Sequence, residues 1–135
     1  MDIEALNRDM IKLVELKNEL SQMDYNQPEY DDKEETLHDM EDDFLEQYGD
    51  YLEDALHMVH DEYCPDDDVL LPTAYLAKEY VAKGDGKYDV KASDGVPVEL
   101  DDFGGKIGRL ALIPNPVRLV LTIGKQHKEA VWQAK

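Results

Sequence analysis

The sequence lacks the features that mark several classes of protein. Cys64 is the single cysteine among 135 residues, so no intramolecular disulfide can form and the fold needs no oxidising compartment. No stretch approaches the roughly 20 apolar residues that span a bilayer. The N-terminal sequence MDIEALNRDM also lacks the basic and apolar segments of a secretory signal. These absences predict a cytoplasmic protein that does not engage a membrane.

Few side chains are placed for catalysis. The only serines, Ser21 and Ser93, lie outside any nucleophile-elbow pattern. Cys64 is surrounded by carboxylates, which raise the pKa of a thiol and disfavour the nucleophilic thiolate. The glycine-containing segments KGDGKYD and DDFGGKIG do not match the phosphate-loop pattern. The sequence therefore predicts no catalytic residue, and nothing in it supports an enzymatic activity.

Positive charge is scarce in the first half of the chain. Residues 1–68 hold 24 Asp and Glu against 4 Lys and Arg, whereas residues 69–135 hold 8 against 10. The net charges of −20 and +2 predict two segments in different surroundings, packed together as one domain. The acidic segment repels nucleic acid and attracts a protein with a basic surface, and the basic residues of the second half are expected on the solvated sides of strands.

Two apolar patterns with three- and four-residue steps predict two long helices in residues 1–68. The first runs to about Met23, and its buried seam is expected to hold Ile3, Leu6, Met10, Leu13 and Leu20. The second runs from about Asp31 to Cys64, where Pro65 ends it. Gly49 lies mid-pattern and costs about 1 kcal/mol of helix propensity, so one bent helix and two helices are both compatible with it. A polar segment around Pro28 separates the patterns, which predicts an antiparallel hairpin.

The second half changes character after residue 68. The segment LPTAYLAKEYVAKG predicts a short third helix from Pro72 to a cap at Gly84, and a strand through VLLPTAYL is the competing prediction. Two hairpins are then expected, one with its turn at Asp94-Gly95 and one at PNP between RLALI and VRLVLTI. EAVWQA is the expected last strand. The pattern indicates an antiparallel β-meander of about five strands.

The predicted fold class is therefore α+β, with an N-terminal antiparallel helical hairpin, a short third helix and a C-terminal antiparallel β-meander. One face of the sheet is apolar and needs a cover, for which the helices are the available elements. That face is expected to carry Leu110, Leu112, Val117, Leu119, Leu121, Ile123 and Trp132.

One cluster in the second helix has the composition of a metal site. At about 100° per residue, His57, His60, Asp61 and Cys64 share one helix face at the i, i+3, i+4 and i+7 spacing. Imidazole, thiolate and carboxylate are all zinc ligands, so zinc is the candidate cofactor. Against this prediction, the face lies opposite the apolar stripe and no paired second cluster exists. The alternative is a solvated polar face with no metal.

The leading functional hypothesis is a non-enzymatic interaction protein. Its acidic hairpin would bind a basic protein surface or associate with a second copy of the chain. The alternative is a solvated acidic helix without a partner. The candidate partner-binding residues are Asp31, Asp32, Glu34, Glu35, Asp42, Asp43 and Glu46.

Overall fold

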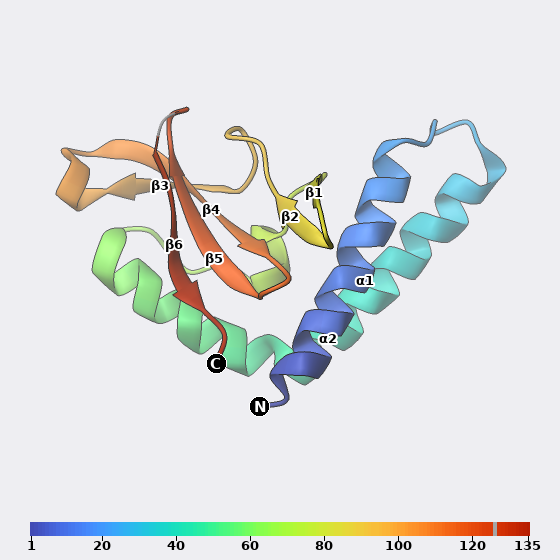
Figure 1. Ribbon diagram of the computed structural model, residues 1–135, viewed down its shortest axis with the longest axis horizontal. Helices are drawn as coiled ribbons and strands as arrows, with labels where there is room; N and C mark the ends of the chain where they lie inside the picture. The colour runs from blue at the N-terminus through green and yellow to red at the C-terminus, as the bar shows by residue number, and fades with distance from the viewer. Residues whose placement is uncertain (126) are drawn as a thin grey trace.

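The computed structural model describes residues 1–125 and 127–135, with Asp102 described by its backbone alone. Two long helices, α1 (Ile3–Ser21) and α2 (Pro28–Tyr63), precede two antiparallel sheets (Figure 1). The first sheet is a two-stranded hairpin, and the second has four strands in sequential order. The α+β fold class, the helical hairpin and the meander are confirmed.

Helix α1 forms where the apolar seam predicts it. The Asp2 carboxylate accepts a hydrogen bond from Ala5 N at 3.0 Å and caps the first turn. Leu6, Met10 and Leu13 are buried against α2 and the sheet. The helix ends at Ser21, two residues before the predicted boundary, within the usual uncertainty of helix ends.

Helix α2 is one continuous helix of 36 residues. It begins at Pro28, where a missing N–H costs nothing, and it ends at Tyr63 just before Pro65. Gly49 is buried inside it, and Figure 1 shows the helix changing direction near its middle. The first half consequently lies along α1, whereas the second half runs below the four-stranded sheet (Figure 1).

The four-stranded sheet is an antiparallel meander in the order β3-β4-β5-β6. Its strands are β3 (Val96–Leu100), β4 (Lys106–Ile113), β5 (Arg118–Ile123) and β6 (His127–Gln133). The predicted PNP turn joins β4 to β5, and the segment EAVWQA forms most of β6. Both predictions succeed because turn residues separate apolar runs that fit strands.

The segment between α2 and β3 differs from the prediction. Its only helical part is a 3-10 helix over Pro72–Tyr75, and Gly84 ends strand β1 (Val81–Gly84) instead of capping a helix. Asp85 and Gly86 both have positive φ, 53° and 75°, and turn the chain into β2 (Lys87–Asp89). That conformation suits the Asp-Gly pair of a two-residue hairpin turn, which outweighs the weak helical pattern.

The hairpin predicted at Asp94-Gly95 is wrong. Its two flanking segments do not pair, because β2 belongs to the two-stranded sheet and β3 to the four-stranded one. An Asp-Gly pair specifies a turn but not the partner of the strands beside it.

The sheet is covered on both faces. Leu110, Leu112, Leu119 and Leu121 join the main core with α1 and α2, so the predicted helical lid is confirmed. The opposite face carries Ala111, Ile113 and Val120, which pack with Tyr80 and Val90 beside the β1–β2 hairpin. Burial on both faces explains why β4 and β5 are nearly continuous apolar runs rather than alternating ones.

Three side-chain amide and hydroxyl groups tie these layers together. Asn18 of α1 accepts a hydrogen bond from Tyr80 N at 2.7 Å and donates to Tyr80 O at 3.2 Å. The buried Tyr80 hydroxyl donates to Leu112 O at 2.7 Å and accepts from Ala77 N at 2.9 Å. At the β4–β5 turn, Asn7 of α1 accepts from Asn115 N at 2.7 Å. These bonds fix the sheets relative to the hairpin.

Candidate functional site

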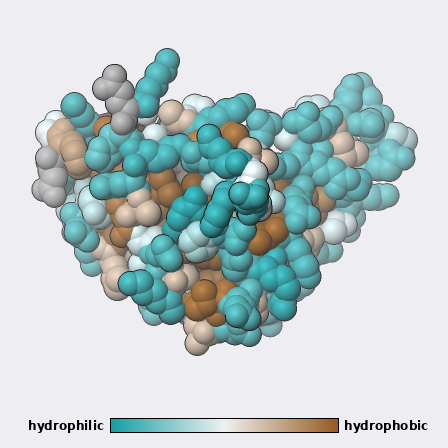
Figure 2. Space-filling view, viewed as in Figure 1, coloured by the Kyte–Doolittle hydropathy of each residue, from teal (hydrophilic) through white to brown (hydrophobic). Residues whose placement is uncertain are grey.

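The carboxylates of α2 form the most distinctive surface of the protein. The helix contains 15 Asp and Glu and a single Lys, Lys33. Of the seven predicted partner-binding residues, Glu34 is half-buried and the other six are exposed. Figure 2 shows hydrophilic side chains over the projecting end of the α1–α2 hairpin, which we call the arm.

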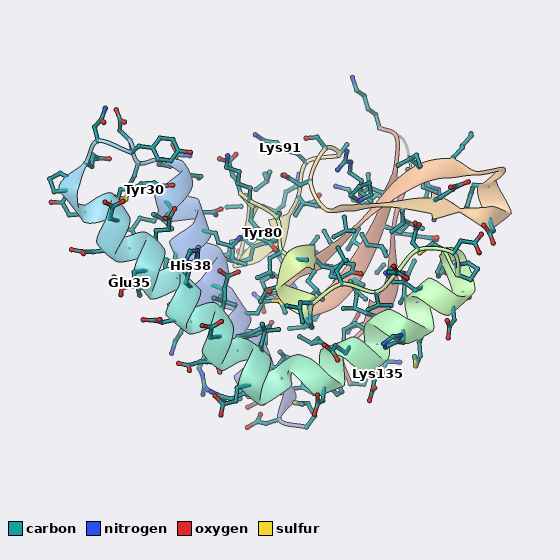
Figure 3. The ribbon with its side chains drawn as sticks, turned by 180° about the vertical axis from the view of Figure 1, so that it is seen from behind. Tyr30, Glu35, His38, Tyr80, Lys91 and Lys135 are labelled. Carbon is teal, nitrogen blue, oxygen red and sulfur yellow. The ribbon has the colours of Figure 1, made fainter. Side chains whose placement is uncertain are left out.

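Four of these carboxylates line up along the helix. At about 100° per residue, Asp31, Glu35, Asp42 and Glu46 fall within about 60° of one another and span about 22 Å. The buried residues Leu37 and Phe44 point to the opposite side, toward α1. We call these four carboxylates the acidic row. Figure 3 shows Glu35 on the outer side of the arm, turned away from the sheet.

No ion pair among the described residues neutralises the acidic row. Lys33, the cation of α2, pairs with Glu19 of α1. Among the described residues, no carboxylate of α2 takes part in an ion pair. Asp31 and Glu35, and likewise Asp42 and Glu46, are like charges at i and i+4, which destabilise a helix by about 0.2–0.5 kcal/mol per pair. The fold therefore keeps an exposed line of mutually repelling charges.

A hydrogen bond joins the two helices of the hairpin. The Tyr48 hydroxyl of α2 donates to the Asp9 carboxylate of α1 at 2.6 Å, and within α2 the Tyr48 ring lies 5.2 Å from that of Phe44. Burial and the hydrogen bond to Asp9 raise the pKa of Tyr48 to about 12, so the phenol keeps its proton at neutral pH. The acidic row is thus presented on a preorganised surface.

An aromatic pair at the end of the arm was missed by the sequence reasoning. Tyr25, in the turn between α1 and α2, is 77% exposed, and its ring centroid lies 5.0 Å from that of Tyr30. Tyrosine is enriched at protein interfaces because its ring adds contact area and its hydroxyl adds a hydrogen bond. The signal in the sequence that could have identified the pair is the presence of two tyrosines inside the polar segment DYNQPEY.

The predicted metal ligands are split between the surface and the core. His57 and Asp61 are exposed, whereas His60 is 2% exposed and Cys64 is 0% exposed. Within residues 1–125 and 127–135, no group of three or more His, Cys, Asp or Glu side chains is arranged to hold a metal ion. The burial of His60 and Cys64 differs from the expected solvated face, because the chain folds back after Pro65 and packs against the end of α2.

His60 is instead part of a buried hydrogen-bond network. Its Nδ1 lies 3.1 Å from Asp67 O, and its Nε2 lies 2.8 Å from the hydroxyl of Tyr75. A carbonyl oxygen only accepts, so Nδ1 donates to Asp67 O, and in the neutral imidazole Nε2 is then the acceptor for the Tyr75 hydroxyl. The Tyr75 oxygen in turn accepts from Leu70 N at 3.1 Å. Both imidazole nitrogens are occupied, which gives His60 a role in holding the loop after α2.

Cys64 is equally unsuited to chemistry. Burial, with a smaller effect from Asp67, raises the pKa of its thiol to about 11. The thiolate is the reactive and metal-binding form, and at neutral pH this cysteine is a thiol. Cys64 therefore packs as a small apolar side chain in the main core.

Comparison with known proteins supplies no family for this chain. No protein-family model matches it, and neither does a curated protein or a solved structure. Within the described part of the chain, no helix combines the length and apolarity needed to cross a membrane. The features that bear on function are consequently the acidic row, the aromatic pair and the arm that carries them.

Proposed function

We propose that this chain is a non-enzymatic interaction protein whose arm binds a basic surface on a protein partner. The observation that carries the proposal is the acidic row, which is exposed and has no ion-pair partner among the residues described. A basic surface would relieve the repulsion between these carboxylates and gain favourable pairs with them.

Charge alone is insufficient for a tight complex. An exposed ion pair contributes about 0–1 kcal/mol, and charges separated by more than about 8 Å are screened at physiological ionic strength. The acidic row therefore mainly speeds the encounter and selects a basic partner. Tyr25 and Tyr30, at the end of the same arm, supply contact area that can add affinity in the docked complex.

The expected partner surface follows from these dimensions. It carries several Lys or Arg side chains along about 22 Å, matching the length of the acidic row. Association with a second copy through the helices is the other form of the proposal. Self-association would require the second copy to place cations against the acidic row, although each copy has a net charge of −18. A different protein with a basic surface therefore fits the charges better.

The proposal is tested by replacing the row without changing the side-chain shapes. The row variant carries Glu35→Gln, Asp42→Asn and Glu46→Gln, all at exposed positions beyond the first turn of α2. A matched control removes the same three charges at exposed positions near the opposite end of the molecule (Figure 1). The control carries Asp66→Asn, Glu99→Gln and Asp101→Asn.

All three proteins are used as baits in quantitative affinity capture at low salt, and each is also sedimented alone. We expect the wild type and the control to retain the same basic protein and the row variant to lose it, with elution by moderate salt. If the wild type and the control self-associate and the row variant is monomeric, the result would support association with a second copy of the chain. Equal capture by all three baits, or no capture together with a monomeric wild type, would refute the proposal.

A further inference from the structure

The cations of the second half gather around one hollow. A depression of about 330 Å³ lies where the β1–β2 hairpin meets strands β5 and β6. Lys83, Lys87, Arg118 and Lys128 line it, against the carboxylates Asp89 and Glu129. In a chain whose net charge is −18, this lining has a net charge of +2. The sequence pattern suggested only scattered, solvated cations, because the hairpin that brings Lys83 and Lys87 to β5 was not predicted.

Arg118 is fixed at this hollow without a carboxylate partner. One terminal nitrogen of its guanidinium donates to Pro114 O at 3.1 Å and Pro116 O at 3.0 Å, and the other donates to Tyr88 O at 3.0 Å. In the part of the chain that the structure describes, Arg118 forms no ion pair. Burial lowers the pKa of its guanidinium, the sign of a positive charge that has lost water without gaining a full counter-charge.

The two carboxylates of the lining are already engaged. Lys128 donates to Asp89 at 2.8 Å and to Val90 O at 2.9 Å, which ties the hairpin to β6. Glu129 lies 3.5 Å from Nε2 of His127. Lys83 and Lys87 are exposed, and neither pairs with any described carboxylate. Lys83, Lys87 and Arg118 thus lie on three strands without an ion pair among the described residues, although the charge of Asp89 still attracts Lys83 and Arg118.

We propose that this hollow binds a small organic phosphate. A phosphate group carries the charge and the acceptor oxygens that two ammonium groups and a fixed guanidinium can satisfy together. The volume is at the lower end of the range for small-molecule sites, about 300–1,000 Å³. Tyr88 also lines the hollow, and its ring packs edge-on with that of Tyr80.

The high net negative charge of the chain does not forbid this site. Glu35 of the acidic row lies on the outer side of the arm, away from the sheet (Figure 3), and the other three carboxylates share its helix face. Interactions between exposed charges more than about 8 Å apart are largely screened at physiological salt. The potential felt by a ligand inside the hollow is set mainly by the residues that line it.

The test uses titration calorimetry of the full chain with inorganic pyrophosphate and with adenosine monophosphate, and with citrate as a non-phosphate anion. The site variant carries Lys83→Ala and Lys87→Ala. Both lysines are exposed, and neither forms an ion pair with a described residue, so their removal should not disturb the fold. The control variant carries Lys106→Ala and Lys125→Ala, two exposed lysines outside the hollow, and changes the net charge equally. Arg118 is left intact because it holds the β4–β5 turn.

We expect saturable binding of both phosphates, weakened about tenfold or more in the site variant and within about twofold of wild type in the control. Amide NMR shifts on titration should map to β1, β2 and β5. The proposal is overturned if neither phosphate binds saturably, if both variants lose binding equally, or if citrate binds as tightly as pyrophosphate. This outcome is independent of the acidic row, which neither variant touches.

Discussion

Replacing Tyr75 by Phe tests whether the buried hydrogen-bond network at the end of α2 holds the 3-10 helix over Pro72–Tyr75 to α2. Tyr75 is 0% exposed, and its hydroxyl donates to His60 Nε2 at 2.8 Å and accepts from Leu70 N at 3.1 Å. Tyr75→Phe keeps the ring and removes both hydrogen bonds. His60 is 2% exposed, so its Nε2 acceptor has no access to replacement water.

The cost follows from these contacts. A net hydrogen bond contributes about 0.5–1.5 kcal/mol, and a buried polar atom left without a partner costs about 1–3 kcal/mol. The Leu70 N–H lies near the surface and can recover a bond to water, because Leu70 is exposed. We therefore expect Tyr75→Phe to lower the free energy of unfolding by about 2–3 kcal/mol.

Urea unfolding followed by far-ultraviolet circular dichroism measures this change. With a slope of about 1–3 kcal/mol per molar urea, the midpoint should fall by about 0.7–3 M. Tyr51→Phe is the matched control, because the Tyr51 hydroxyl makes only long contacts of 3.5 and 3.4 Å with the backbone of Lys135. The control should change stability by less than about 0.5 kcal/mol. A Tyr75→Phe protein as stable as the control would refute the claim that this buried network stabilises the fold.

The remaining predictions concern the metal question, the joint between α1 and the hairpin, and the thiol. Metal analysis of untagged protein should find no stoichiometric zinc, and a chelator should leave the melting temperature unchanged. One zinc per chain that is lost in the His57→Ala variant would contradict this expectation, which follows from the burial of two of the four predicted ligands. Asn18→Ala removes both bonds to the Tyr80 backbone and should cost about 1–3 kcal/mol in urea unfolding, and an effect below 0.5 kcal/mol would show that the joint does not depend on them. The Cys64 pKa is raised by burial to about 11, above about 8.5 in the unfolded chain, so its contribution to stability is complete below pH 8.5 and is lost as pH rises toward 11. Cys64→Ala should flatten this alkaline decline in melts recorded across that range, and an unchanged decline would assign it to other groups.

The periodic parts of the fold could be predicted from the sequence. Helix α1, helix α2 and the β4–β5 hairpin each bury a regular apolar pattern, and turn or capping residues mark their ends. Exposure of the acidic row was predictable for the same reason, because a helix with one buried seam leaves its opposite side in water.

The parts that failed depend on contacts between distant segments. Tyr75 and Tyr80 are placed by hydrogen bonds to α2, to α1 and to β4, and no local pattern encodes such bonds. His60 and Cys64 were assigned to a solvated face because a single apolar stripe was assumed along all of α2. The end of α2 is buried over a wider arc, since the segment after Pro65 packs back on it. Local periodicity cannot report a cover that arrives from elsewhere in the chain.

The central claim is that the acidic row binds a basic protein surface, and the capture comparison of the wild type, the row variant and the charge-matched control tests it most directly. We expect a basic partner that is retained by the wild type and the control and lost from the row variant, while all three proteins remain folded. Relief of like-charge repulsion should leave the row variant at least as stable as the wild type, so lost binding cannot be blamed on unfolding. A partner that binds the row variant as well as the wild type would contradict the account.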